Sequence, residues 1–289
     1  MRTRFAPSPT GPLHLGHAFS ALTAWDMARA ADGTFLLRIE DIDRSRARPE
    51  WEAAIFDDLA WLGLDWPTPV MRQSDRQPAY DAALDRLWSA GLLYPCTCTR
   101  RDIATALSAP QEGAVPTGPD GPVYPGTCRP GPHWRPSGPR PDGALRLHMD
   151  RAAAWIGGDG VAFDEVGTES ERKLQFRAFD NLLTGTGDVV LARRDMGTSY
   201  HLSVTVDDAD QGITRVVRGA DLFEATFIHR ILQELLGLAA PSYHHHRLIR
   251  DTAGKRLAKR DDARALATYR ATGETPCDLR RRLNLPPAP

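Results

Sequence analysis

Residues 4–17 of the 289-residue chain read RFAPSPTGPLHLGH. A short predicted strand leads into a loop of prolines and glycines, and a His-x-Gly-His turn then opens a predicted helix. Gly16 lets the backbone come close to a ligand. The N-terminus of a helix directs unpaired N–H groups and partial positive charge toward an anion. His14 and His17 lie three residues apart and can face the same anion, so the turn predicts a phosphate site, although a single histidine is more often structural.

The residues that follow this turn predict an α/β fold. Residues 17–31 are rich in alanine and predict a helix that ends at Gly33. Residues 34–39 (TFLLRI) are short and apolar, which predicts a buried strand. Residues 49–64 and 78–91 each begin with proline and carry apolar residues at helical spacing. This alternation of strands and helices is typical of a parallel sheet with crossover helices.

The composition changes between residues 109 and 143, which hold ten of the 23 prolines and seven glycines and predict little regular structure. Beyond this segment the α/β pattern returns. Strands are predicted at residues 144–149, 188–193, 200–206 and 215–217, and a helix at 221–238. We therefore expect the first half of a Rossmann-like catalytic domain at 1–95, an inserted Pro/Gly-rich module at 96–143, the rest of the insertion and the second half of the domain at 144–240, and a C-terminal segment at 241–289.

The overall composition is that of a globular protein, with 42% apolar, 25% charged and 8% aromatic residues and a net charge of −1. No stretch approaches the roughly 20 apolar residues of a membrane span. The N-terminus has no apolar segment typical of a secretory signal, so we expect a cytoplasmic protein. The net charge excludes a uniformly basic coat for nucleic acid but not a local basic patch.

A second motif, GKRLAKR, occupies residues 254–260. Only three of the 36 cationic residues are lysines, namely Lys173, Lys255 and Lys259. A lysine in an arginine-rich chain suggests a need for a compact ammonium group. Basic hexapeptides are common, however, so this motif predicts a function only in combination with the histidine turn that precedes it in the sequence.

Together the two motifs resemble the signatures of class I aminoacyl-tRNA synthetases. Residues 4–17 are similar to the HIGH signature in its glutamyl form, which implies a Rossmann-like domain that binds ATP, with Mg²⁺, at His14, Gly16 and His17. In that family the two histidines stabilise phosphate charge while a carboxylate attacks the α-phosphorus, which agrees with how phosphoryl-type transfers are catalysed.

Residues 256–260 resemble the mobile KMSKS loop of the same enzymes. The resemblance implies that Lys259 contacts the ATP phosphates and the departing pyrophosphate. Two positions depart from the signature, because Arg256 replaces a lysine and Ala258 replaces a serine. Arginine keeps the charge and alanine removes one possible hydrogen bond, so we expect at worst a slower enzyme.

The resemblance also implies a glutamate pocket. Its residues would be Arg4, Phe5, Ala6, Pro7, Ser8, Glu40, Tyr200 and Arg218. A carboxylate such as Glu40 suits the ammonium group of glutamate, and an arginine can bind a carboxylate through two hydrogen bonds. Open α/β sheets place ligands at strand ends, where several of these residues lie. The alternative for each of them is a surface ion pair.

Three of the four cysteines flank the Pro/Gly-rich segment. Cys96 and Cys98 form a C-x-C pair, and Cys128 follows Tyr124 by four residues. Such thiols suit a structural zinc ion that fixes a segment without its own core, although buried free thiols are an equal alternative. The resemblance implies Tyr124 as the fourth ligand, with His133 as the rival. Cys277 is expected to be a spare thiol, and four cysteines do not make a disulfide scaffold.

The chain stops 29 residues after Arg260. A full glutamyl-tRNA synthetase continues for roughly 150 to 200 residues with an anticodon-binding domain of ordinary size. The chain therefore resembles the short glutamyl-queuosine tRNA(Asp) synthetase family, which activates glutamate with ATP and attaches it to queuosine in the anticodon loop of tRNA(Asp). His17 stands where many members carry serine, so a truncated glutamyl-tRNA synthetase core remains an alternative. A non-catalytic tRNA-binding relative and a nucleotidyltransferase acting on another substrate are the others.

Residues 247–283 carry eleven Lys or Arg and five Asp or Glu. A charge run is usually a solvated helix face, but here it could contact tRNA phosphates, which predicts salt-sensitive binding. We expect a monomer that binds the anticodon arm of tRNA(Asp).

Overall fold

The computed structural model describes residues 1–108, 116–167, 172–250 and 265–288. Its first sheet holds three parallel strands in the order β1-β2-β3, namely β1 (Arg2–Phe5), β2 (Thr34–Ile39) and β3 (Met71–Arg72). Helix α1 (Leu15–Ala30) connects β1 to β2, and α2 (Pro49–Trp61) connects β2 to β3. These elements confirm the predicted strand at 34–39 and the predicted helices, and Leu22, Leu37 and Ile55 are buried in the core that they share.

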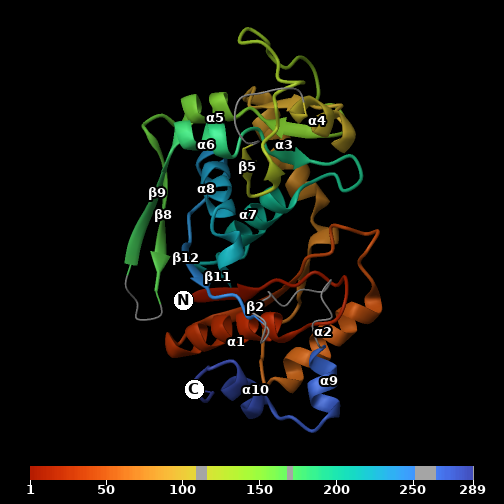
Figure 1. Cartoon of the computed structure of the whole chain (residues 1–289), viewed down its shortest axis with the longest axis vertical. Coiled ribbons are helices and arrows are strands. Elements are labelled where there is room, and N and C mark those ends of the chain that lie inside the picture. Colours follow the sequence, from red (N-terminus) through yellow and green to blue (C-terminus); the bar gives the residue numbers. More distant parts are fainter. Residues whose placement is uncertain (109–115, 168–171, 251–264, 289) are drawn as a thin grey trace.

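The second sheet continues beside β1. Its order is β11-β12-β8-β9, formed by β11 (Arg215–Gly219), β12 (Ser242–His246), β8 (Gly160–Val166) and β9 (Arg172–Ala178). Strand β12 is parallel to both β11 and β8, whereas β9 is antiparallel to β8. The Thr214 amide donates to the Arg2 carbonyl at 3.0 Å, which joins the start of β11 to β1. The carboxyl ends of β1, β2, β11 and β12 therefore meet at the centre of the molecule (Figure 1).

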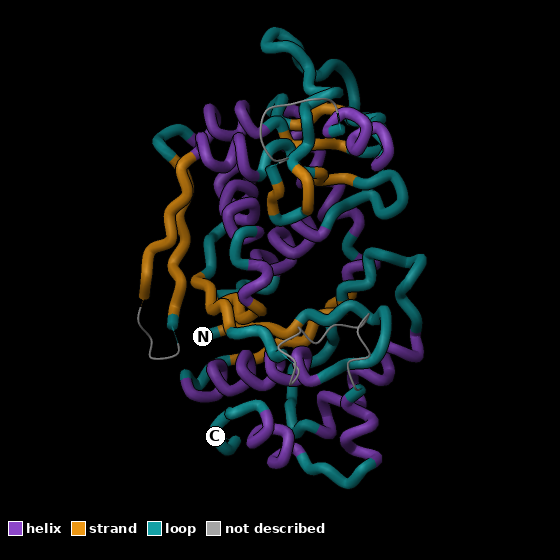
Figure 2. The backbone as a smooth tube through the Cα atoms, in the orientation of Figure 1, coloured by secondary structure: helices purple, strands orange, loops and turns teal. Residues whose placement is uncertain are grey.

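The chain between β3 and β11 supplies a second body of structure. Strands β4 (Leu93–Pro95), β7 (Leu145–Leu147) and β10 (Val190–Ala192) form an antiparallel sheet in the order β10-β7-β4. The helices of this region are α3 (Gln77–Ser89), α4 (Arg100–Leu107), α5 (Met149–Ile156), α6 (Phe179–Gly185), α7 (Tyr200–Asp210) and the 3-10 helix η1 (Gln73–Asp75). Figure 2 shows this part at the end of the molecule opposite the C-terminus.

Among the described residues of the Pro/Gly-rich segment (116–143), regular structure is confined to one short hairpin, which agrees with the expectation of little regular structure. Strand β5 (Thr117–Gly118) pairs antiparallel with β6 (Gly121–Pro122). A Cβ atom on Gly118 would lie 2.6 Å from the carbonyl oxygen of Gly185. Such contact is too close for any side chain, so the hairpin rests directly on the backbone after α6.

Residues 200–206 were expected to form a strand, and this prediction is wrong. They lie in helix α7 (Tyr200–Asp210), which begins after Ser199, whose side chain accepts a hydrogen bond from the Leu202 amide. Residues 201–208 are all buried. A helix that is buried on every side shows no 3.6-residue alternation of apolar and polar residues, so its sequence carries no helical period.

The last elements are α8 (Ala225–Leu236), preceded by the 3-10 helix η2 (Ala220–Leu222), and the short helices α9 (Leu266–Ala271) and α10 (Pro276–Arg282). Helices α9 and α10 lie below α1 in Figure 1. Leu266, Leu279 and Leu283 are buried in the same core as α1, so α9 and α10 are packed into the fold. Among the described residues, no helix has the length and apolar character needed to cross a bilayer.

Candidate active site

A cavity of about 370 Å³ opens where the ends of β1, β2, β11 and β12 meet. It brings together residues that are far apart in the sequence. Its lining includes Arg4, Phe5, Ala6, His14, Gly16, His17, Glu40, Tyr200 and Arg218. Two residues of the predicted set, Pro7 and Ser8, are not among the lining residues, and Ser8 is exposed. The structure therefore joins the predicted phosphate turn and most of the predicted glutamate set in one cavity.

The two histidines of the turn cap helix α1. The amide of Gly16 donates to Nδ1 of His14 at 3.1 Å, and the amide of His14 donates to Nδ1 of His17 at 3.2 Å. A neutral imidazole whose Nδ1 accepts a hydrogen bond carries its proton on Nε2. A Cβ atom on Gly16 would lie 3.0 Å from the His14 ring, so glycine allows this arrangement. Two imidazole donors beside a helix N-terminus suit a phosphate group.

Lys259, Arg256 and Ala258 lie outside the described residues, since residues 251–264 are not described. Described residues on both sides of this segment lie at the cavity. Ile249 lines the cavity, and Ala265 forms an isolated antiparallel bridge with His14. The chain therefore leaves and re-enters the described structure beside the phosphate turn.

A buried charge cluster forms one wall of the cavity. Arg4 donates to both carboxylate oxygens of Asp208 at 3.0 and 3.3 Å, and Arg38 donates to Asp208 at 2.8 Å and to Glu40 at 3.1 Å. Burial raises the pKa of Glu40, which Arg38 and Arg4 offset only in part. Burial also acts to raise the pKa of Asp208, but these two arginines outweigh it and hold that pKa below its usual value. Arg4 therefore lines the cavity as the charge partner of Asp208.

The sequence analysis assigned no role to Arg38 or Asp208. Two features of the sequence could have indicated them. Arg38 stands inside an otherwise apolar predicted strand, and the acids Asp207 and Asp208 follow an apolar stretch. Charges in such positions are rarely buried without a partner.

Arg218 is buried but has a different kind of environment. Its Nη2 donates to Thr226 Oγ1 at 2.6 Å, Nη1 contacts His229 Nδ1 at 3.2 Å, and Nε donates to His245 Nε2 at 3.2 Å. The Tyr200 hydroxyl lies 3.5 Å from Nη1. Within the described residues, none of the hydrogen-bond partners of Arg218 is a carboxylate. A buried guanidinium without an anionic partner is costly, so its position on the cavity suits a carboxylate ligand.

His246 is a cavity residue that the sequence analysis did not single out. It is buried, and its Nδ1 lies 2.9 Å from the Arg247 carbonyl, which places the proton on Nδ1. Its Nε2 is buried and has no hydrogen-bond partner in the described structure. This nitrogen can accept a hydrogen bond from a ligand donor. The run of three histidines at 244–246 was the available signal.

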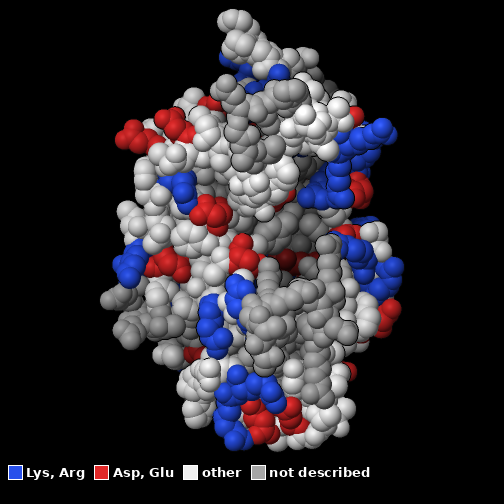
Figure 3. All heavy atoms as spheres, in the orientation of Figure 1, with Lys and Arg blue, Asp and Glu red and all other residues white. Residues whose placement is uncertain are grey.

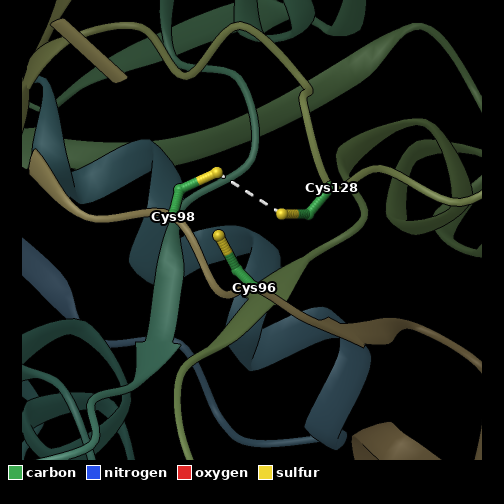
Figure 4. Close-up of side chains that lie close together, drawn as sticks. All are labelled: Cys96, Cys98 and Cys128. Atoms are coloured by element: carbon green, nitrogen blue, oxygen red, sulfur yellow. Dashed lines mark hydrogen bonds between the residues drawn. The ribbon is translucent and has the colours of Figure 1, made fainter. Parts of the chain in front are cut away.

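The three cysteines of the inserted module (residues 96–143) come together, as Figure 4 shows. The sulfur atoms of Cys96, Cys98 and Cys128 lie within 4.8 Å of one another. The Tyr124 hydroxyl lies 3.6 Å from Cys96 Sγ and 3.4 Å from Cys98 Sγ. With Zn–S bonds of about 2.3 Å, tetrahedral ligand atoms are about 3.8 Å apart. The four atoms therefore fit a tetrahedral metal site.

The geometry favours Tyr124 over the rival ligand His133. His133 is exposed, and the metal-binding group found among the described residues contains no histidine. Cys277 is exposed and belongs to α10 at the other end of the molecule. The cysteines that could hold a metal are therefore the three that the sequence indicated.

Arg146 adds a positive charge to this centre. Its Nε donates to Cys96 Sγ at 3.3 Å, and its guanidinium carbon lies 3.7 Å from the centre of the Tyr124 ring. Its Nη1 donates to the Asp188 carbonyl at 2.7 Å, which fixes its orientation. Three thiolates and a phenolate exceed the charge of a divalent cation, so a buried guanidinium beside them offsets negative charge.

The basic C-terminal segment is partly neutralised within the fold. Arg280 is buried and donates to both carboxylate oxygens of Asp26 at 2.9 and 2.6 Å. Arg281 and Arg282 are exposed and pair with Asp278 and Glu274. Figure 3 shows cationic and acidic side chains intermixed at this end of the molecule. Arg280 is therefore a structural residue, whereas Arg281 and Arg282 face solvent.

Comparison with known proteins is consistent with this site. Residues 1–120 and 144–286 match the family model for "tRNA synthetases class I (E and Q), catalytic domain". The glutamyl-Q tRNA(Asp) synthetase of Rhodobacter capsulatus is 63% identical over 285 residues, which are 99% of this chain and 100% of that protein. The protein of the same name from Burkholderia cenocepacia is 44% identical over 266 residues, which are 92% of this chain and 82% of that protein.

The fold also matches solved structures. A glutamate tRNA ligase from Elizabethkingia meningosepticum, crystallised with its amino acid, has a TM-score of 0.68 and 28% sequence identity. The match covers 90% of this chain and 52% of that ligase, so this chain spans about half the length of the ligase.

Proposed function

Because the chain belongs to the class I tRNA synthetase family with an E- and Q-type catalytic domain, we propose that it activates glutamate with ATP and transfers it to the queuosine base of tRNA(Asp). The observation that carries the glutamate assignment is Arg218, a buried cation on the cavity whose hydrogen-bond partners among the described residues are all uncharged. A side-chain carboxylate of the substrate would supply the missing anion. Glu40, which directly follows β2 and lines the same cavity, suits the ammonium group.

The phosphate turn would serve the chemical step. The α-carboxylate oxygen of glutamate attacks the α-phosphorus of ATP, the bond to the β-phosphate oxygen breaks, and pyrophosphate leaves. The Nε2–H groups of His14 and His17 and the N-terminus of α1 stabilise the charge that develops on the phosphate oxygens. Lys259 would follow the departing pyrophosphate, and Mg²⁺ would accompany ATP.

The cysteine cluster would hold one structural Zn²⁺ ion through Cys96, Cys98, Tyr124 and Cys128. Its support is the donor set and its spacing. The ion would tie residues 96–98 to residues 124–128 and so give the inserted module (residues 96–143) a fixed point that its small core does not supply. The two parts of the catalytic domain, 1–95 and 144–240, flank this module, and 241–289 complete the fold.

The nucleic-acid partner would be the anticodon arm of tRNA(Asp), as the names of the relatives suggest. Exposed arginines such as Arg281 and Arg282 could contact its phosphates. We expect the protein to act in the cytoplasm, where tRNA is, and to act as a monomer.

Glutamate-dependent exchange between ATP and pyrophosphate, measured with and without tRNA, tests the proposal. We expect exchange with glutamate alone. Exchange that requires tRNA would instead favour glutamyl-tRNA synthetase activity, since those enzymes resemble one another in needing tRNA for activation. No exchange in either case would contradict the proposed activity.

A further inference from the structure

A chain of buried side chains leads from Arg218 to the inserted module. Nη1 of Arg218 lies 3.2 Å from Nδ1 of His229, and Nε2 of His229 lies 3.1 Å from Nδ1 of His201. Nε2 of His201 lies 3.0 and 3.1 Å from the two carboxylate oxygens of Asp120. His201 and His229 are 5% and 3% exposed. Strand β11, helices α8 and α7, and the turn of the β5–β6 hairpin therefore meet in one hydrogen-bonded line, which starts at the cavity and ends at Asp120.

Arg218 at one end of this line and Asp120 at the other determine which ring nitrogen of each histidine carries the proton. A guanidinium has no acceptor, so His229 must accept at Nδ1 and carries its proton on Nε2. That proton is donated to Nδ1 of His201, which therefore carries its own proton on Nε2 and donates it to Asp120. Both imidazoles must be neutral for this order. In agreement, burial and the charge of Arg218 hold the pKa of His229 well below its usual value.

We propose that Asp120 of the inserted module is a positioning residue for glutamate recognition, which acts on Arg218 through His201 and His229. The inference rests on the proposed function, in which Arg218 binds the substrate carboxylate. Asp120 does not line the cavity and touches no substrate. It sets the tautomer of His201, and through it the acceptor that holds one Nη atom of Arg218 in place.

Removal of Asp120 would release this order. The opposite order, with the protons on Nδ1 of both imidazoles, would then be opposed only by the guanidinium of Arg218, and molecules that adopt it would lose the acceptor at Nδ1 of His229 that faces Arg218. A second arm would remain, because His245 accepts from Arg218 Nε and contacts Glu165 of β8 at 2.7 Å. The loss should therefore be partial. It should affect the binding of glutamate more than that of ATP, whose predicted phosphate site lies at the turn of His14 and His17.

The test compares Asp120→Ala, Asp120→Asn and the control Asp142→Ala in glutamate-dependent exchange. Asp142 is an exposed acid of the same module. We expect Asp120→Ala to raise the KM for glutamate about tenfold, a typical size for coupling between linked groups, with the KM for ATP and kcat changed less than about twofold. Asp120→Asn keeps an oxygen acceptor for His201 and should restore most of the affinity. Asp142→Ala should match the unmodified protein.

An unchanged KM for glutamate in Asp120→Ala would overturn the inference, as would an equal rise in the KM for ATP. A protein that shows no glutamate-dependent exchange before any substitution would contradict the proposed function instead. The ring nitrogens give a second readout that needs no activity. In ¹⁵N spectra of the imidazoles, Asp120→Ala should change the tautomer signature of His201, and an unchanged signature would also overturn the inference.

Discussion

Arg218 is the residue that we propose to bind the substrate carboxylate, and its hydrogen-bond partners among the described residues are all uncharged, so its removal should be costly. We expect Arg218→Gln to lower kcat/KM for glutamate by at least about 30-fold, or about 2 kcal/mol, which is the lower end for the loss of one member of a buried charge pair. Glutamate-dependent exchange measures this loss. Arg215→Gln is the matched control, because Arg215 lies on the same strand but outside the cavity and donates to Ser242. Equal losses in the two variants would contradict the assignment of Arg218.

Lys259 can be tested in the same assay. Its ammonium group would balance charge on the departing pyrophosphate, so Lys259→Ala should slow activation at least about tenfold, or ~1.4 kcal/mol. Lys173 on β9 is an exposed lysine outside the cavity, and Lys173→Ala should leave activation unchanged. Unchanged activation in Lys259→Ala would refute the resemblance of residues 256–260 to the mobile loop.

At the scale of single residues, the sequence named many of the groups that line the cavity, although not His246, and missed the buried groups that hold them in place. Glu40, Tyr200 and Arg218 could be matched to a family motif because each lies in a recognisable stretch. His201 and His229 lie in no recognisable motif. Their roles depend on hydrogen-bond partners that are distant in the sequence and become neighbours only in the folded protein. Spacing along the chain carries no information on such contacts.

Among the elements, the inserted module brings three cysteines and Tyr124 together as possible metal ligands. We expect Cys98→Ser and Tyr124→Phe to lower the zinc bound to the purified protein, because each removes one ligand atom of a tetrahedral site. Mass spectrometry of the native protein, together with competition by a chelator, measures the change. His133→Ala and Cys277→Ser should keep full zinc content. Full zinc in Cys98→Ser would show that this sulfur is not a ligand, and a loss in His133→Ala would restore the rival ligand.

The elements that were predicted correctly carry local sequence signals, whereas the elements that were missed do not. Residues 34–39 form a short apolar run, α1 is rich in alanine, and α2 and α3 each carry a proline in their first turn. Helix α7 is buried on all sides, and β12 (SYHHH) is a central strand rich in histidine, so neither shows the expected pattern. The hairpin of β8 and β9 was also missed, since β9 exposes Leu174 and Phe176. The secondary structure of these segments is determined by tertiary contacts, and such contacts cannot be recognised from the local sequence.

Across the whole molecule, the α/β class and the insertion followed from the alternation of elements and from the proline-rich segment, and the fold class is confirmed. The way in which the inserted part touches the catalytic sheet could not be predicted. Asp120 and His201 are 81 residues apart, and Asp120 and Arg218 belong to different bodies of structure. The buried polar groups that join these bodies also make the stability of the whole protein depend on pH.

Burial lowers the pKa of His229, His245 and His246 below the usual value for histidine. In the unfolded chain these imidazoles have a pKa of about 6.5. Between the lowered values and about 6.5 the unfolded chain binds more protons than the folded protein. Their contribution to stability is therefore complete above about pH 6.5 and is lost as the pH falls, by about 1.4 kcal/mol per group for each pH unit in that window.

We therefore expect the free energy of unfolding, measured in urea, to fall between pH 7.5 and pH 5.5. His229→Gln should make this decline shallower, because glutamine does not titrate and its oxygen can still accept from Arg218. His133→Gln is the control, since the side chain of His133 is exposed and lies outside the hydrogen-bonded line. An equal pH dependence in His229→Gln and the unmodified protein would mean that His229 can take up a proton without cost in the folded state. The proton order required by Arg218 and Asp120 forbids such uptake, so this result would also argue against the hydrogen-bonded line that connects the inserted module to the cavity.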